Sequence, residues 1–152
     1  VMAVKLEGAH IETVKKLVTS GIPVMGHLGL TPQSMHQLGG YRVQGRTDGD
    51  VIVEAAKALQ AAGAFAIVLE LGPAELAARI TAELTIPTIG IGAGVNCDAQ
   101  VLVWTDLMGI TKKAPKLAKA YRNLRAEMLA ATAEFAADVR SGQFPTEAQT
   151  FN

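Results

Sequence analysis

Three short apolar runs of this sequence each carry a side chain that can take part in catalysis, with glycine beside it. The side chains are Glu7, His27 and Glu70, in the runs 3–8, 23–29 and 66–72. An imidazole and two carboxylates can exchange protons with a substrate, and carboxylates also bind metal ions. In folds of alternating parallel strands and helices, reacting groups lie at the carboxyl ends of the strands. We therefore predict that these three residues share one site.

Amphipathic segments separate the apolar runs. Residues 2–7 have the pattern of a strand, and residues 10–19 place apolar side chains at helical spacing before a stop at Gly21. The order of helix end, Ile-Pro, strand and glycine at 22–26 occurs again at 86–90, which is an internal repeat. The other predicted elements are helices at 52–59, 73–84 and 115–140 and strands at 64–69 and 101–104.

Near-continuous apolar strands alternating with amphipathic helices indicate an α/β fold with a parallel sheet covered by helices. Five strands are too few to close an eight-stranded barrel, and the sequence begins inside a strand pattern. We therefore expect one domain, residues 1–152, that is the carboxyl-terminal part of a larger barrel whose N-terminal strands are missing here. A complete, open five-stranded sheet is the competing interpretation.

Composition narrows the class of partner. The chain has 152 residues, 49% hydrophobic and 18% charged, which is typical of a globular domain with a real core. Fourteen basic residues balance fourteen acidic ones, so neither nucleic acid nor an anionic membrane is an expected partner. The single cysteine, Cys97, cannot form an internal disulfide, and we find no signal peptide or membrane-length apolar run. We expect a cytoplasmic protein with a small-molecule or protein partner.

The connection after the second strand, residues 28–49, is unusually long and rich in glycine and hydrogen-bonding side chains. Long loops in compact domains are usually functional or disordered. In this loop and the run before it, the sequence resembles the ketopantoate hydroxymethyltransferase family. The resemblance continues in order through residues 4–8, 63–70, 73–76, 86–94 and 98–104.

This resemblance implies a TIM (β/α)8 barrel, of which the chain covers about the last five strands and their helices. It also implies the transfer of a one-carbon unit from 5,10-methylenetetrahydrofolate to 3-methyl-2-oxobutanoate, giving 2-dehydropantoate. The implied cofactor is Mg²⁺, which polarises the keto group and stabilises an enolate. The implied assembly is a homo-oligomer, a decamer. The family's two metal-binding aspartates fall outside this sequence, so we expect the chain to be inactive alone.

The resemblance assigns a role to four residues. Glu70 matches the proton acceptor, Glu7 the metal carboxylate, and Lys5, on the same strand face as Glu7, the residue that contacts the keto acid. His27 borders the keto-acid site. From the residues alone, Glu70 could instead be a solvated or salt-bridged strand-end glutamate, Lys5 and Glu7 a structural ion pair, and His27 a buried structural group.

The sequence also departs from the family pattern in places. Leu71-Gly72 follows Glu70 where the family has a small residue and valine, and Ala9 replaces a common glycine. The glycines of residues 90–94 are better explained by a tight turn near substrate than by a phosphate cradle, because no P-loop lysine follows. Two other functions stay open: a Mg²⁺-dependent 2-oxo-acid lyase on the same barrel, and a truncated subunit that only packs in an assembly.

Overall fold

The computed structural model describes residues 1–151, and it divides into two compact units. The first unit runs from Val1 to Val101 and the second begins at Leu102. No helix within residues 1–151 has the length and apolar character that crossing a membrane requires.

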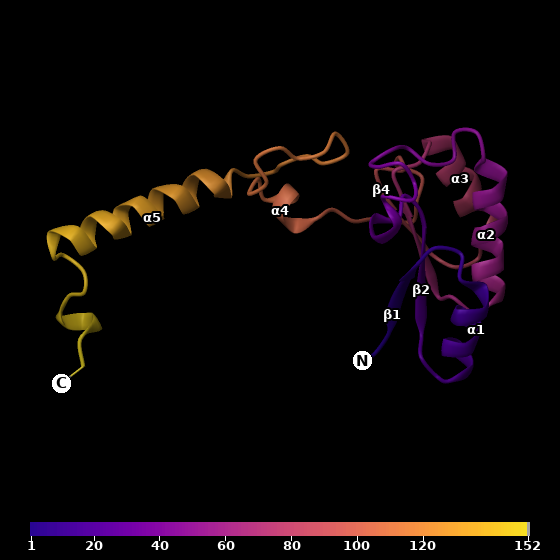
Figure 1. Cartoon of the computed structure of the whole chain (residues 1–152), viewed down its shortest axis with the longest axis horizontal. Coiled ribbons are helices and arrows are strands. Elements are labelled where there is room, and N and C mark those ends of the chain that lie inside the picture. The colour runs from indigo at the N-terminus through magenta and orange to yellow at the C-terminus, as the bar shows by residue number, and fades with distance from the viewer. Residues whose placement is uncertain (152) are drawn as a thin grey trace. The chain divides into compact units, whose positions relative to one another are not determined.

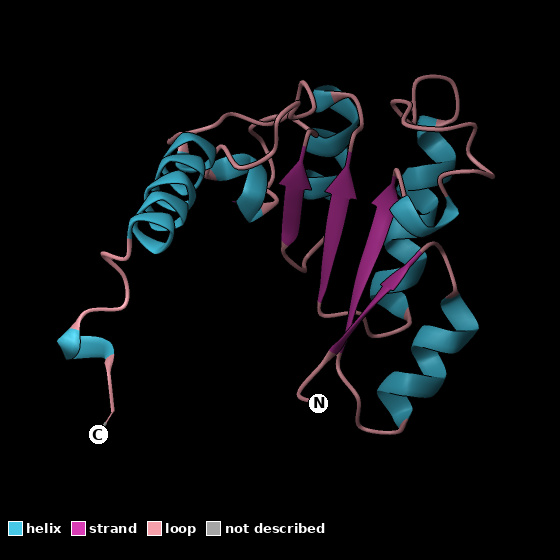
Figure 2. Cartoon of the chain, turned by 60° about the vertical axis from the view of Figure 1, so that its left-hand side comes forward, coloured by secondary structure: helices cyan, strands magenta, loops and turns pink. Residues whose placement is uncertain are grey.

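The first unit is a parallel sheet with helices between its strands. The strands stand side by side in the order β1-β2-β3-β4-β5, and every neighbouring pair is parallel. Figure 2 shows the strand arrows pointing the same way. The strands are β1 (Val4–Glu7), β2 (Val24–Gly29), β3 (Ala66–Glu70), β4 (Thr88–Ile91) and β5 (Ala99–Gln100). The α/β class is therefore confirmed, and five parallel strands alternating with helices are consistent with part of a (β/α)8 barrel.

Three helices cover one face of this sheet (Figure 1). They are α1 (Ile11–Thr19), α2 (Gly49–Ala61) and α3 (Ala74–Glu83), and they agree with the helices predicted from apolar spacing. Alternate strand residues such as Val24 and Ile67 point toward them and pack with Leu59 and Ile80 in a buried core. Because strand side chains alternate between faces, residues such as Met25 and His27 lie on the opposite face.

The connection after β2 is a loop with one short turn of 3-10 helix, η1 (Pro32–Ser34), before α2 begins at Gly49. Its backbone is attached to β3: Leu30 N–H donates to the Glu70 carbonyl at 2.8 Å, and Gln44 N–H donates to the Leu71 carbonyl at 3.0 Å. The long connection therefore lies over the carboxyl ends of the strands.

The predicted fifth strand was misplaced by two residues. We expected it at 101–104, whereas β5 is Ala99–Gln100 and Trp104 begins the short helix α4 (Trp104–Leu107). The last backbone bond of this ladder is from Val101 N–H to the Gly90 carbonyl, at 3.0 Å. An apolar run identifies a segment that can form a strand. Which of its residues are in the strand depends on where the neighbouring strand ends.

The second unit corrects another expectation. The helix predicted at 115–140 is α5 (Leu124–Ser141), which starts later because the Asn123 side chain caps it by accepting from Ala126 N–H at 3.3 Å. No residue of α5 is buried in the structure described here. The tail after it, with η2 (Glu147–Gln149), packs back on this helix: Phe144 meets Phe135 edge to face, with ring centroids 5.3 Å apart.

A buried threonine fixes the turn between β4 and β5. The backbone N–H of Thr88 donates to Asp98 Oδ2 at 2.8 Å, and its hydroxyl does so at 3.0 Å. The hydrogen bond from the Thr88 backbone has the larger effect and that from its hydroxyl the next largest, and both hold the pKa of the Asp98 carboxyl below its ordinary value. The ionised carboxylate is thus the form that the fold prefers.

We predict that this contact stabilises the fold at neutral pH and is lost in acid. A carboxyl whose pKa is lower in the folded state stabilises the fold above its unfolded pKa, and that contribution disappears as the pH falls through the folded pKa. Asp98→Asn should therefore lower the melting temperature at pH 7, and the difference from the unmodified chain should shrink below about pH 4. Melting curves by circular dichroism at both pH values measure it. Thr88→Val, which removes only the hydroxyl, should give a smaller effect with the same pH trend; a difference that does not change with pH would contradict the assignment.

Candidate active site

Four polar side chains from three neighbouring strands meet on the sheet face opposite the helices. Glu7 on β1 pairs in register with His27 on β2, and Lys5 lies two residues before Glu7 on the same face. Glu70 ends β3 two residues beyond Val68, which pairs with His27. The parallel register thus brings together all four site residues predicted from the sequence.

His27 is the centre of this cluster. Its ring is 3% exposed, and its Nδ1 lies 2.8 Å from Lys5 Nζ and 3.7 Å from Glu7 Oε1. On the other side of the ring, Nε2 lies 3.3 Å from Glu70 Oε2. That distance suits an ion pair, yet the geometry falls short of a hydrogen bond, and Nε2 has no well-formed partner in the described structure. The side chains of Lys5, Glu7 and Glu70 thus all lie next to the imidazole of His27.

Glu7 uses its two carboxylate oxygens differently. Oε1 lies 3.5 Å from Lys5 Nζ and faces His27, whereas Oε2 accepts the backbone N–H of Gln33 at 3.0 Å. Gln33 lies in η1, so this bond attaches the loop after β2 to the end of β1. The sequence analysis did not identify this contact, because a backbone donor carries no signal in its residue type.

Glu70 is held at the end of β3 by its backbone surroundings. It is 8% exposed, and Leu71 directly after it has φ 49°, the single positive value outside glycine in residues 1–151. A left-handed leucine is strained and persists only where neighbouring contacts require it, which is common at functional sites. The departure at Leu71-Gly72 noted in the sequence therefore coincides with an unusual backbone turn beside the candidate base.

The neighbouring strand comes unusually close at this point. Gly29 of β2 has φ 87°, and a Cβ built on it would overlap the Glu70 carbonyl oxygen. This approach allows the adjacent Leu30 N–H to donate to the same carbonyl. Gly29, two residues after His27, is thus required by the position of Glu70 on the next strand.

A hollow on this face is suited to a small acid with an apolar part. Lys5, His27 and Glu70 form its polar rim, and the rest of its lining is apolar: Met25, Val68, Ile89, Ile91 and Val101. The Lys5 side chain is 43% exposed, so its ammonium can meet an anion from solvent. A buried carboxylate beside it can accept a proton from the bound molecule.

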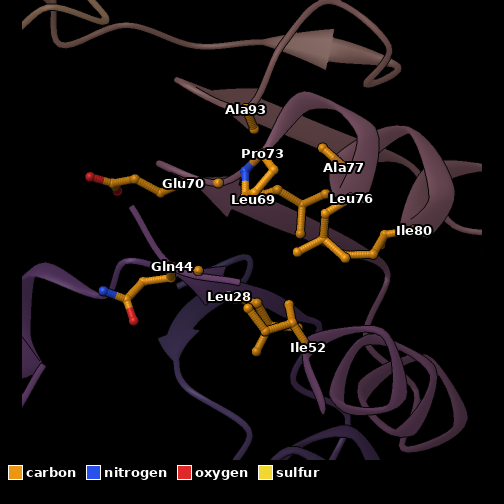
Figure 3. Close-up of a pocket in the computed structure, with 12 residues that line it drawn as sticks. Leu28, Gln44, Ile52, Leu69, Glu70, Pro73, Leu76, Ala77, Ile80 and Ala93 are labelled. Carbon is orange, nitrogen blue, oxygen red and sulfur yellow. The ribbon is translucent and has the colours of Figure 1, made fainter. Parts of the chain in front are cut away.

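A second cavity lies on the helix side of the sheet and is a different kind of space. It is lined mostly by apolar side chains of β2, β3, α2 and α3. Figure 3 shows the Glu70 carboxylate turned away from Leu69, Leu76 and Ile80 of this cavity. Glu70 lines both spaces, and its carboxylate points away from the apolar side chains of the helix-side cavity.

We tested whether these residues suit a magnesium ion. In residues 1–151 there is no group of three or more histidine, cysteine or carboxylate side chains that could hold a metal. Mg²⁺ is usually bound through one or two carboxylates, with water and substrate oxygens completing its shell. Glu7 fits as one such ligand, directly or through water, because its Oε1 faces the site. The described chain alone does not supply a full ligand set.

Buried acid–base groups at the carboxyl ends of parallel strands, beside an open hollow, are the arrangement typical of active sites in α/β enzymes. Comparison with known proteins specifies the family: the protein-family model described as ketopantoate hydroxymethyltransferase matches residues 1–147. The chain therefore belongs to the ketopantoate hydroxymethyltransferase family.

Curated relatives agree with this family. The 3-methyl-2-oxobutanoate hydroxymethyltransferase of Acidothermus cellulolyticus is 58% identical over 155 residues, covering 99% of this chain and 57% of the relative. The protein of the same name from Frankia casuarinae is 55% identical over 148 residues, covering 95% and 50%. That from Rippkaea orientalis is 58% identical over 147 residues, covering 93% and 57%. The chain spans about half the length of the curated relatives it matches.

We predict that Gly29→Ala destabilises the chain more than an otherwise similar change at Gly21. Both glycines have left-handed backbones, φ 87° and 82°, but only at Gly29 would the new methyl meet the neighbouring strand. Gly21→Ala should cost about 1 kcal/mol for the strained backbone alone. Gly29→Ala should cost about 1–3 kcal/mol more, because β2 and β3 must move apart. Urea unfolding of the two variants measures the difference; equal midpoints would show that the close approach at Glu70 is not required.

Proposed function

We propose that the chain carries half of the active site of an enzyme that transfers a hydroxymethyl group to 3-methyl-2-oxobutanoate, giving 2-dehydropantoate for pantothenate biosynthesis. The one-carbon donor is 5,10-methylenetetrahydrofolate, water supplies the hydroxyl oxygen, and tetrahydrofolate is released. The observation that carries this proposal is that family membership over nearly the whole chain coincides with the buried Glu70–His27 pair at the strand ends. In the whole protein, these five strands would be the last five of a (β/α)8 barrel, in a cytoplasmic homo-oligomer.

Glu70 acts as the base in this proposal. Its carboxylate takes the proton from C3 of the keto acid, and the electrons of the broken C–H bond move into an enolate. The enolate carbon then forms the new bond to the one-carbon unit. The burial of Glu70 supports this role, because a carboxylate held away from bulk water accepts a proton from carbon more readily.

Lys5 and Glu7 bind and orient the keto acid. The exposed ammonium of Lys5 offers a positive charge for the substrate carboxylate, and the apolar lining of the hollow suits its branched alkyl group. When bound, Mg²⁺ supplies polarisation of the keto carbonyl, and Glu7 is the residue of this chain that would hold it. His27 forms the wall between these two groups and the base.

We predict that Glu70→Gln and Glu7→Gln separate the two roles. Because the chain spans about half the relatives' length, activity is measured after joining it to the part of the Acidothermus relative that it does not match. The amide at residue 70 cannot accept the proton, so hydrogen–deuterium exchange at C3 and product formation should fall about 10²- to 10⁴-fold while Mg²⁺ binding is kept. The change at Glu7 should weaken Mg²⁺ binding, measured by calorimetry, by about tenfold or more.

Glu75→Gln is the matched control, since Glu75 is an exposed glutamate in the first turn of α3 and lies outside the site. It should leave exchange and product formation unchanged. A joined enzyme that is folded and binds Mg²⁺ but neither exchanges C3 hydrogen nor forms product would overturn the proposed reaction. Turnover by the 152-residue chain alone would contradict the expectation that it holds only part of the site.

A further inference from the structure

We propose that Lys5 holds His27 as a neutral imidazole with its proton on Nε2, and that His27 uses this proton to orient the Glu70 carboxylate. His27 is thus a positioning residue for the base and more than a wall of the substrate site. The catalytic consequence rests on the proposed function, whereas the arrangement of the three side chains does not.

The contact with Lys5 fixes one side of the imidazole. A lysine ammonium carries only donors, so at 2.8 Å the His27 Nδ1 must be the acceptor. A proton on Nδ1 would place two donors face to face at hydrogen-bonding distance, and Glu7 Oε1, at 3.7 Å, is too far from Nδ1 to accept that proton. The proton of the neutral ring must therefore be on Nε2.

The Glu70 side of the ring agrees with this tautomer. An Nε2–H group 3.3 Å from Glu70 Oε2 is a donor facing an acceptor, and a small rotation of either side chain forms the hydrogen bond. With the proton on the other nitrogen, a ring lone pair would face a carboxylate, and both would be buried without a donor. The unpartnered buried Nε2 is thus explained as a donor aimed at the candidate base.

This arrangement leaves the two oxygens of Glu70 with different tasks. In the proposed arrangement Oε2 accepts the hydrogen bond from His27 Nε2–H, which leaves Oε1 as the oxygen that takes a proton. In the described structure His27 is the only charged or polar side chain paired with this carboxylate. Without that contact, the carboxylate could rotate about its last bond and would present the wrong oxygen for part of the time.

The tautomer can be tested on the 152-residue chain by nitrogen-15 NMR of its three histidine rings, His10, His27 and His36. Single His10→Gln and His36→Gln changes assign the signals. At neutral pH we expect His27 to show an unprotonated Nδ1 and a protonated Nε2. A protonated Nδ1, or a ring protonated on both nitrogens, would overturn the proposal.

Lys5 variants test what fixes the tautomer. Lys5→Met should give a mixture of the two neutral forms at His27, whereas Lys5→Arg should keep the Nε2–H form because a guanidinium also only donates. Lys15→Met removes an exposed lysine of α1 and should change nothing at His27. The backbone NMR spectrum checks that each variant is folded. An unchanged tautomer in a folded Lys5→Met chain would show that Lys5 does not set it.

Two substitutions at His27 test the positioning role in the joined enzyme. Glutamine can place an N–H donor where Nε2 was, whereas asparagine reaches only the Nδ1 position. We therefore expect His27→Asn to lower kcat for C3 exchange about tenfold or more below that of His27→Gln, with little difference in KM for the keto acid. Equal kcat values in two folded variants would overturn the positioning role. The proposed reaction itself fails separately, by absence of exchange in the unmodified joined enzyme.

Discussion

The parallel register of β1, β2 and β3 is the constraint on which the site depends. Glu7 lies directly opposite His27, and Glu70 ends the next strand two residues beyond the partner of His27. A slip of one residue in either pairing would turn a reactive side chain toward the helices and bury it in the core. The apolar side chains that pack under α1, α2 and α3 set this register, so the core and the site are determined by the same alternation.

Packing at the strand ends then decides how close the groups come. The missing side chain at Gly29 lets the loop after β2 donate to the Glu70 carbonyl, and the strained turn at Leu71 accepts from Gln44 of the same loop. The Gln33 backbone adds a third attachment, at Glu7. The loop that carries the most distinctive residues of the sequence is thereby held against both carboxylate-bearing strands. The backbone N–H groups of Leu30, Gln33 and Gln44 make these attachments, so they do not depend on the side chains of the loop.

Charge balance explains why so many ionisable groups can share one small space. A buried carboxylate is costly unless a donor or an opposite charge faces it, and the two glutamates of the site share one imidazole and one ammonium. The ammonium is the only one of the four that reaches solvent to a large extent. The positive charge of the cluster is therefore exposed to solvent at Lys5, whereas the His27 and Glu70 side chains are buried.

By itself, the sequence determined the α/β class and the positions of β1 to β4 and α1 to α3, and it singled out four side chains that the structure places together. These follow from short-range rules: apolar spacing, Ile-Pro and glycine punctuation, and reactive residues at strand ends. It misplaced β5 and the start of α5, because an apolar run shows neither where the pairing strand ends nor which side chain caps a helix. Which groups touch, the Gln33 contact and the turn at Leu71 were decided only by the tertiary structure. Those features depend on distances between residues far apart in the chain, and only the packed sheet with its attached loop sets such distances.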